Sequence, residues 1–172
     1  NIPDADLVIG GFPCQGFSHA NMKRNTQDGR NSLYLEMLRI IGAKKPSFFV
    51  AENVKGLLTL DKGQVFQRIK DDFENCGYEV SHRLLNAADY GVPQTRQRVF
   101  IVGRKIGQKR RYEFPYPTHS QKIDLIDSNL LPWVSIGTAL KDLPEPEEAP
   151  HISNHTFSKY KLRFNGYLGH RW

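Results

Sequence analysis

Cys14 lies in a run of small and turn-forming residues, Gly10 to Ser18, that directly follows the apolar segment Asp6–Ile9. The apolar segment predicts a buried strand, so the cysteine is expected on a tight loop at the carboxyl end of that strand. In open α/β sheets this edge is where ligands bind. A lone cysteine is more often a packed core residue, but the glycines and the proline of this loop favour an accessible, nucleophilic thiol.

Two further groups of polar residues are predicted at the same edge of the sheet. Glu52 directly follows the apolar segment 47–51, and Arg96 and Arg98 precede the apolar segment 99–102. Taken singly, such residues are typical of solvated strand ends or structural ion pairs. Taken together with the thiol, they would place a nucleophile, an acid or base, and two cations along one edge.

This set of groups suits the attack of a thiolate on an electron-poor ring. A carboxylic acid can protonate a ring nitrogen as negative charge builds up, and arginine can hydrogen bond a carbonyl oxygen. The sequence shows no metal-ligand pattern, because His19 and His82 have no partners at ligand spacing. Gly10-Gly11 also lacks the rest of the dinucleotide-binding fingerprint. Nucleophilic chemistry on a ring is therefore the favoured interpretation.

The elements that must position these groups alternate between strands and helices over the first hundred residues, which is typical of an α/β fold. Apolar residues recur at helical spacing in several segments, and short apolar runs between them predict strands. Gly77 is expected to end the second helix. Strands are predicted over 6–9, 47–51, 78–85 and 99–102, and helices over 32–41, 62–75 and 134–143.

Composition and charge narrow the class of protein. The 172 residues, 39% of them hydrophobic and 24% charged, can form one ordinary globular domain. The 24 Lys and Arg against 18 Asp and Glu leave a net charge of +6, which favours a polyanionic partner such as nucleic acid. No apolar stretch reaches the roughly 18 residues of a membrane helix, so no membrane partner is expected. Two cysteines make no disulfide framework, which favours a reducing compartment.

Three short motifs together resemble the DNA (cytosine-5) methyltransferase family. Pro13-Cys14-Gln15 resembles the family's nucleophile motif, Glu52-Asn53-Val54 its acid motif, and Gln94-x-Arg96-x-Arg98 its third catalytic motif, all in the family's order. The segment from Asp28 to Leu33 also resembles the end of the family's mobile catalytic loop. The resemblance covers residues 3–144, and its strength lies in three motifs that occur in order on the expected elements.

The resemblance implies a doubly wound, Rossmann-like methyltransferase sheet, of which this chain holds the second half only. Residues 1–144 would belong to the catalytic domain without its N-terminal cofactor-binding half, and residues 145–172 would begin a small target-recognition domain. The family's glycine-rich cofactor motif has no counterpart here. We therefore expect a fragment of a longer or split enzyme, inactive alone, whose open sheet edge pairs with a complementing chain or with another copy of the fragment.

The resemblance also implies a role for each site residue. Cys14 would attack carbon 6 of a cytosine flipped out of double-stranded DNA, and Glu52 would protonate ring nitrogen 3. Arg98 would bind the carbonyl oxygen of the base, with Arg96 beside it, and carbon 5 would accept a methyl group from S-adenosylmethionine. The other implied contacts are with DNA, from Gln15, Ser18, Asn53 and Gln94, and with the cofactor, from Pro13 and Leu33.

Three alternatives remain open from the sequence. A methyltransferase of cytosine in tRNA shares the core motifs, although Gly16-Phe17-Ser18 after the nucleophile favours DNA. A non-catalytic DNA-binding or regulatory partner would keep the fold without the cofactor, but it has no need of four intact catalytic residues. A cysteine hydrolase would need a histidine opposite Cys14, and His19 is too near in the sequence. The expected location is the bacterial cytoplasm.

Overall fold

The computed structural model describes residues 2–13, 32–121, 129–144, 148–149 and 151. The chain divides into two compact units, Asn1–Val134 and Ser135–Trp172. The boundary predicted between residues 144 and 145 separates a catalytic domain from a target-recognition domain. This division by function stays a prediction. None of the helices in the described ranges is long and apolar enough to cross a membrane.

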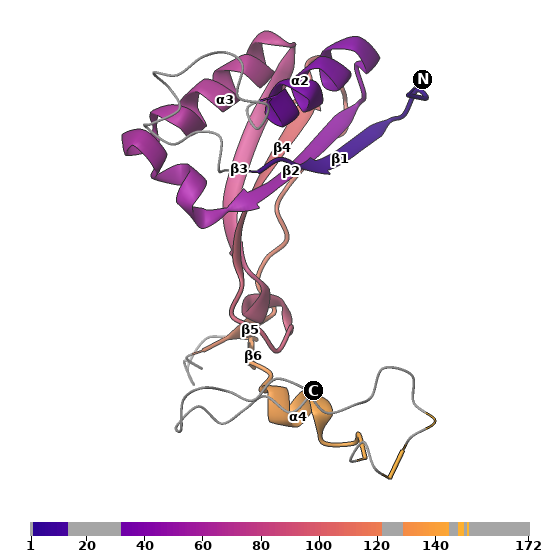
Figure 1. Ribbon diagram of the computed structural model, residues 1–172, viewed down its shortest axis with the longest axis vertical. Helices are drawn as coiled ribbons and strands as arrows, with labels where there is room; N and C mark the ends of the chain where they lie inside the picture. The colour runs from indigo at the N-terminus through magenta and orange to yellow at the C-terminus, as the bar shows by residue number, and fades with distance from the viewer. Residues whose placement is uncertain (1, 14–31, 122–128, 145–147, 150, 152–172) are drawn as a thin grey trace. The chain divides into compact units, whose positions relative to one another are not determined.

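The first unit is built on a mixed sheet of four strands in the order β1-β2-β4-β3 (Figure 1). β1 runs parallel to β2, whereas β4 runs antiparallel to both β2 and β3. Because β4 runs the other way, it starts at the edge where β1 and β2 end, and the predicted motifs are therefore brought to one edge. The strands are β1 (Leu7–Gly11), β2 (Phe48–Val54), β3 (Tyr78–Asn86) and β4 (Gln97–Lys105).

Two helices, α2 (Ser32–Lys44) and α3 (Gln64–Asn75), cover one face of this sheet. Their apolar residues pack on strand residues that alternate along this face, which confirms the predicted α/β class. The main members of this buried cluster are Tyr34, Met37, Ile41, Val65, Phe66, Ile69 and Phe73 from the helices, and Phe49, Ala51, Val99 and Ile101 from the strands.

The two helices are tied together at Tyr34. Its ring contacts Phe12 and Phe73, with centroids 5.5 Å and 6.1 Å away. Its hydroxyl donates a hydrogen bond to the carboxylate of Asp72 on α3. Burial and the neighbouring Asp72 both raise the pKa of Tyr34 above its ordinary value, so the hydroxyl keeps its proton and remains a donor.

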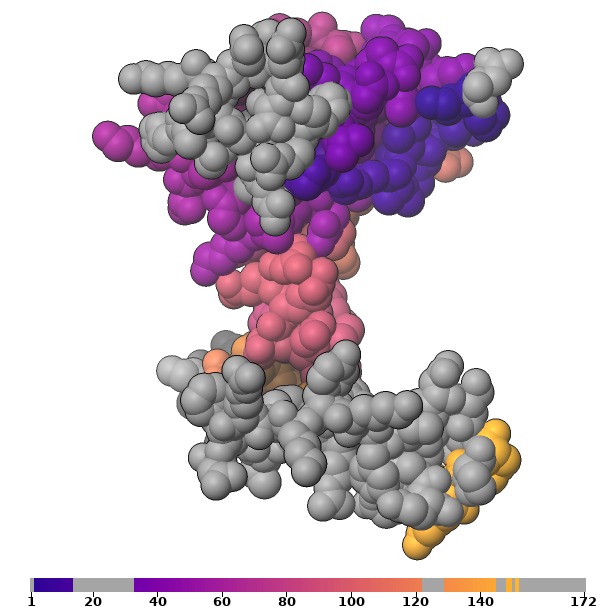
Figure 2. Space-filling view, viewed as in Figure 1, coloured from indigo at the N-terminus to yellow at the C-terminus, as the bar shows by residue number. Residues whose placement is uncertain are grey.

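The opposite face of the sheet is open at β1. Leu7 and Ile9, which alternate with the core-packed Val8, are 46% and 72% exposed. Within the described residues the outer edge of β1 pairs with no other strand. Figure 2 shows the indigo N-terminal residues at the surface of the first unit. Among the residues that the structure describes, this edge therefore leaves apolar side chains exposed and backbone groups without a neighbouring strand.

Most predicted element boundaries differ from the structure by one to three residues, and two of them differ for a clear local reason. The second strand was expected to end at residue 51, but β2 continues to Val54 because β4 pairs along its whole length. The second helix was expected from residue 62, but α3 begins at Gln64. Asp61 and Lys62 have positive φ angles, and Gly63 has a φ of 87°, so these residues form a kinked 3₁₀ turn instead.

Short elements complete the described residues. The 3₁₀ helices are η2 (Lys55–Leu58), η3 (Leu60–Gly63) and η4 (Ala87–Tyr90), and β5 (His119–Ser120) pairs in parallel with β6 (Leu131–Pro132). In the second unit, the helix predicted over 134–143 is shorter, α4 (Ile136–Leu140). The Ser135 hydroxyl caps it by accepting a hydrogen bond from the backbone N–H of Thr138, 3.0 Å away.

Replacing Gly103 with alanine should destabilise the first unit. Gly103 lies opposite Phe49, and a Cβ at this position would come within 1.9 Å of the fully buried Phe49 ring. Overpacking of this kind should lower the free energy of unfolding by about 3 kcal/mol, measured by urea denaturation. The added substitution Phe49→Leu should recover part of this loss, because the two residues share one space.

Gly56→Ala is the matched control for this prediction. A Cβ at Gly56 meets no atom within 4 Å. Its free energy of unfolding should therefore stay within about 0.5 kcal/mol of the original value. Equal unfolding midpoints for the two alanine variants would contradict the close approach of β4 to Phe49.

Candidate active site

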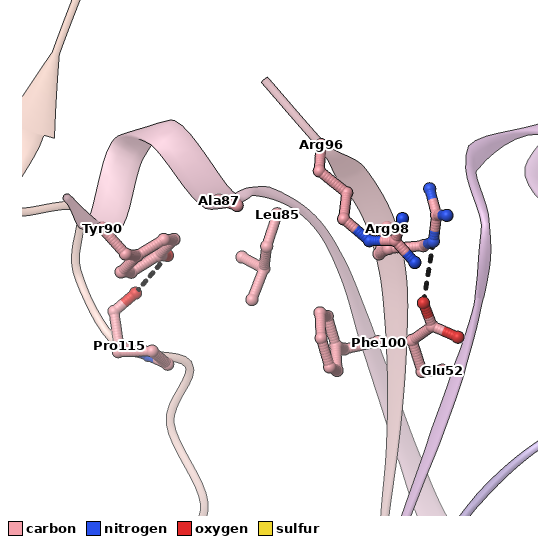
Figure 3. A pocket seen from close by; sticks show the side chains of 8 residues that line it. All are labelled: Glu52, Leu85, Ala87, Tyr90, Arg96, Arg98, Phe100 and Pro115. Carbon is pink, nitrogen blue, oxygen red and sulfur yellow. Dashed lines mark hydrogen bonds and ion pairs between the residues drawn. The ribbon is translucent and has the colours of Figure 1, made fainter. Parts of the chain in front are cut away.

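A pocket opens at the edge of the sheet where β2 ends and β4 begins (Figure 3). Its volume is about 290 Å³, near the lower end of the range for sites that hold a small molecule. A carboxylate and two guanidinium groups line it together with apolar and aromatic side chains. The lining residues are Glu52, Leu85, Ala87, Tyr90, Arg96, Arg98, Phe100 and Pro115.

Glu52 and Arg98 form an ion pair on the wall of the pocket. The Arg98 Nε lies 2.8 Å from the Glu52 Oε1, and the side chains are 24% and 39% exposed. Arg98 is further held by a hydrogen bond from Nη1 to the carbonyl oxygen of Gln97, 2.9 Å away. The carboxylate and the guanidinium are thus fixed next to each other, and both remain accessible from the pocket.

The register of the sheet explains this pairing. Glu52 lies between Gly11 of β1 and Phe100 of β4, and Arg98 lies opposite Val54. Residues two apart on a strand share a face, so Arg98 and Phe100 lie on the face that carries Glu52. Gly11 lies next to the acid in this register, and a Cβ there would be in ordinary van der Waals contact with the Glu52 Oε2, at 3.6 Å. The predicted acid and one predicted arginine are therefore brought together.

Arg96 reaches the same pocket from the turn that precedes β4. Its carbonyl oxygen accepts a hydrogen bond from the N–H of Ala87, and its own N–H donates to the carbonyl oxygen of Gln94, at 2.9 Å and 3.1 Å. Gln94 is exposed and does not line the pocket. Its contribution in the described structure is this backbone contact, and its predicted contact with DNA stays a prediction.

The sequence analysis missed the apolar wall of the pocket. Leu85, Tyr90, Phe100 and Pro115 form this wall, and the Tyr90 hydroxyl donates to the carbonyl oxygen of Pro115 at 3.0 Å. Strand alternation could have placed Phe100 on the face of Arg98, because the two are separated by one residue. Pro115 could not have been found in this way, since it joins the wall through a loop from a distant part of the sequence.

Asn53 fixes the end of β1 to the end of β2. It is 3% exposed, and its Nδ2 donates to the carbonyl oxygen of Phe12 at 2.8 Å. Its Oδ1 accepts from the N–H of Val54 at 2.9 Å. Since both polar ends of the side chain have partners within the protein, this geometry favours a role in bracing the strand ends over the predicted contact with DNA, which stays a prediction.

Several other predicted site residues cannot be placed in the pocket. Cys14, Gln15 and Ser18 lie outside the described residues. Phe12, whose carbonyl is held by the Asn53 amide, precedes the cysteine by two positions in the sequence. The thiol's predicted role as a nucleophile stays a prediction.

The predicted cofactor contacts do not form a binding site by themselves. Pro13 is exposed, and Leu33, near the start of α2, is 52% exposed. Neither offers a polar or charged side chain for the amino acid or ribose part of S-adenosylmethionine. Among the described residues, no group of three His, Cys, Asp or Glu side chains is placed to hold a metal ion.

The comparison with known families agrees with the motifs at this edge. The model of the C-5 cytosine-specific DNA methylases matches residues 1–167, which is nearly the whole chain. The chain belongs to this family. The resemblance inferred from Cys14, Glu52, Arg96 and Arg98 is thereby confirmed at the level of the family.

Curated proteins similar to this methylase chain include bacterial Type II methyltransferases. It is 45% identical over 144 residues to M.NgoFVII of Neisseria gonorrhoeae, an alignment that covers 84% of the chain and 38% of the relative. It is 49% identical over 141 residues to M.BspRI of Lysinibacillus sphaericus, with 82% and 32% covered. M.AquIA of Picosynechococcus sp. is 39% identical over 179 residues, with 95% and 71% covered.

A solved structure supports the fold of the methylase chain. It is a prophage-encoded E. coli protein assigned to the DNA modification methyltransferases, with a TM-score of 0.58 and 30% identity. The match covers 81% of this chain and 35% of that protein. The chain spans about a third of the length of M.NgoFVII and M.BspRI. The Rossmann-like methyltransferase fold is confirmed for the part that the chain contains.

Asn53→Ala should destabilise the methylase chain by about 2 kcal/mol, because the Phe12 carbonyl and the Val54 N–H would lose buried partners. The free energy of unfolding in urea measures this loss. Asn75→Ala is the matched control, since Asn75 is exposed on α3. If the two variants lost equal stability, Asn53 would not be bracing the strand ends.

Proposed function

We propose that the protein containing this chain transfers a methyl group from S-adenosylmethionine to carbon 5 of cytosine in double-stranded DNA. The observation that supports this most is the Glu52–Arg98 ion pair on the wall of a pocket with an apolar side, in a member of the C-5 cytosine-specific DNA methylases. A carboxyl group, guanidinium donors and an aromatic wall suit the polar edge and the flat face of a pyrimidine.

In the proposed reaction, the chain's own residues activate the base. The thiolate of Cys14 attacks carbon 6, forming a carbon–sulfur bond and pushing electrons into the ring. Glu52 gives a proton to ring nitrogen 3, and Arg98 donates hydrogen bonds to the carbonyl oxygen, with Arg96 beside it. Carbon 5 becomes nucleophilic and is methylated. Loss of its proton and elimination of Cys14 then restore the aromatic ring and free the thiol.

The positions of the pocket groups support these roles. Arg98 is already oriented by Glu52 and by the Gln97 carbonyl, so little rearrangement is needed to bind a carbonyl oxygen. The Phe100 ring lies beside this ion pair, and the Tyr90 ring lies across the pocket next to Pro115 (Figure 3). Gln15 and Ser18 are proposed to contact DNA near the flipped base.

We also propose that further polypeptide completes the enzyme. Pro13 and Leu33, the predicted cofactor contacts, offer no polar or charged side chain, and Leu7 and Ile9 expose apolar surface beside the outer edge of β1. M.NgoFVII and M.BspRI, at 45% and 49% identity, are much longer than the region that matches this chain. A complementing segment or chain would cover this edge and hold the cofactor. The bacterial sources of these relatives support a bacterial cytoplasmic location.

Covalent trapping on DNA that contains 5-fluorocytosine tests the proposed reaction. Fluorine at carbon 5 cannot leave as the proton does, so a stable protein–DNA adduct should accumulate in the presence of S-adenosylmethionine. The full protein that contains this chain should form the adduct, whereas residues 1–172 alone should not. Denaturing gel electrophoresis measures the adduct.

Two variants of the full protein test the proposed roles. Cys14→Ala should abolish the adduct, and Glu52→Gln should slow its formation at least about a hundredfold, because the general acid is lost. Cys76→Ala is the matched control, since Cys76 is the other cysteine of the chain and lies at the end of α3. An adduct formed by the Cys14→Ala variant would contradict the role of Cys14 as the nucleophile. Trapping on tRNA instead of DNA would contradict DNA as the substrate.

A further inference from the structure

The turn Asp89–Gly91 forms part of the pocket but has no role in the proposed reaction. It ends η4 (Ala87–Tyr90), and Gly91 has a φ of 83°. The N–H of Gly91 donates to the carbonyl of Ala88, and the N–H of Val92 donates to that of Ala87. The turn is therefore tight, and glycine at position 91 is required by the left-handed backbone.

A segment far along the chain holds this turn from outside. The Trp133 Nε1 donates to the Asp89 Oδ1 at 3.0 Å, and the N–H of Thr118 donates to the Asp89 carbonyl at 2.9 Å. The ring of His119 lies against Gly91 so closely that a Cβ there would be 2.8 Å from its Cε1. Asp89 thus binds the segment through both its side chain and its backbone.

The same turn fixes the positions of two parts of the pocket. Tyr90 lines the pocket and is fixed by its hydrogen bond to the Pro115 carbonyl. At the start of η4, the N–H of Ala87 holds the carbonyl of Arg96 at 2.9 Å. A shift of the turn would therefore move both an aromatic wall and the backbone that carries one of the two arginines (Figure 3).

We propose that Trp133 and His119 are positioning residues, which hold the Asp89–Gly91 turn so that Tyr90 and Arg96 are correctly placed for the cytosine. This inference rests on the proposed function and extends it to residues outside the pocket. Trp133 is also next to the end of the first unit, because the second unit begins at Ser135. The indole hydrogen bond therefore anchors the chain close to the point where the first unit ends.

Removing the indole donor should slow the reaction without weakening DNA binding. Trp133→Phe and Asp89→Ala should each reduce the rate constant of trapping on 5-fluorocytosine DNA about tenfold, since each removes a hydrogen bond to a carboxylate. The dissociation constant for DNA should stay within about twofold of the original value, because charged contacts dominate that affinity. Asp89→Asn keeps the acceptor oxygen and should restore most of the rate.

Tyr78→Phe is the control for general loss of stability. The Tyr78 hydroxyl donates to the Pro46 carbonyl at 2.8 Å in the buried core, at the end of β3 away from the pocket. This variant should unfold more easily but trap DNA at the normal rate. If Trp133→Phe trapped normally, or slowed trapping no more than Tyr78→Phe at equal folded fraction, the inference would be overturned.

A second readout uses the indole proton itself. In the full protein, the Trp133 indole N–H signal is assigned as the one that Trp133→Phe removes, and Trp172→Phe identifies the signal of the other tryptophan in this chain. The Trp133 signal should exchange slowly with solvent in the unaltered protein and in Asp89→Asn, and quickly in Asp89→Ala. Equal exchange rates of the Trp133 indole proton in the unaltered protein, Asp89→Asn and Asp89→Ala would overturn this inference but not the proposed function. Failure of the unaltered full protein, which contains this chain, to trap DNA would overturn the proposed function and this inference together.

Discussion

The candidate site depends on the antiparallel pairing of β4 with β2. This pairing places Glu52 opposite Phe100 and Val54 opposite Arg98, so that an acid near the end of one strand meets a cation near the start of the next. A shift of one residue would turn Arg98 to the helix-covered face and bring Val99 into the pocket. The fully buried Val99 and Ile101 fix this register, because either would be exposed if it slipped.

The same pairing sets the layers of the first unit. Gly103 opposite Phe49 allows the large ring to lie across β4, and Phe49 then packs against Phe73 and Tyr78 at centroid distances of 4.4 Å and 5.2 Å. The core that holds the sheet and helices together is thus on one side. The functional groups occupy the other side and the edge, where packing leaves Glu52 and Arg98 partly accessible.

Much of this arrangement could be predicted from local sequence. The helical spacing of apolar residues predicted α3. The four residues of this face, Val65, Phe66, Ile69 and Phe73, are all buried as expected. The motifs that contain Glu52, Arg96 and Arg98 led to the family and to three residues of the pocket. Such patterns are readable because side-chain periodicity and short motifs lie within one element.

The remainder depends on contacts between distant segments. The extension of β2 to Val54 follows from its pairing with β4, which no property of residues 52–54 reveals. Pro115 enters the pocket wall through tertiary structure, and Asn53 proves to be a buried brace because the Phe12 carbonyl lies beside it. A polar residue within a motif can thus hold strands together as well as take part in a reaction.

The central position of β4 has a consequence for how the protein is made. β4 is the last of the four strands in sequence, yet it lies between β2 and β3, which precede it. While a ribosome has produced only residues up to β3, the strand that pairs with both β2 and β3 is missing. Glu52 on β2 then also lacks Arg98, its ion-pair partner. Synthesis of β4 therefore supplies both Arg98, the ion-pair partner of Glu52, and the strand that joins β2 to β3, late in the synthesis of this unit. A partly synthesised chain therefore cannot bring Glu52 and Arg98 together before β4 completes the sheet.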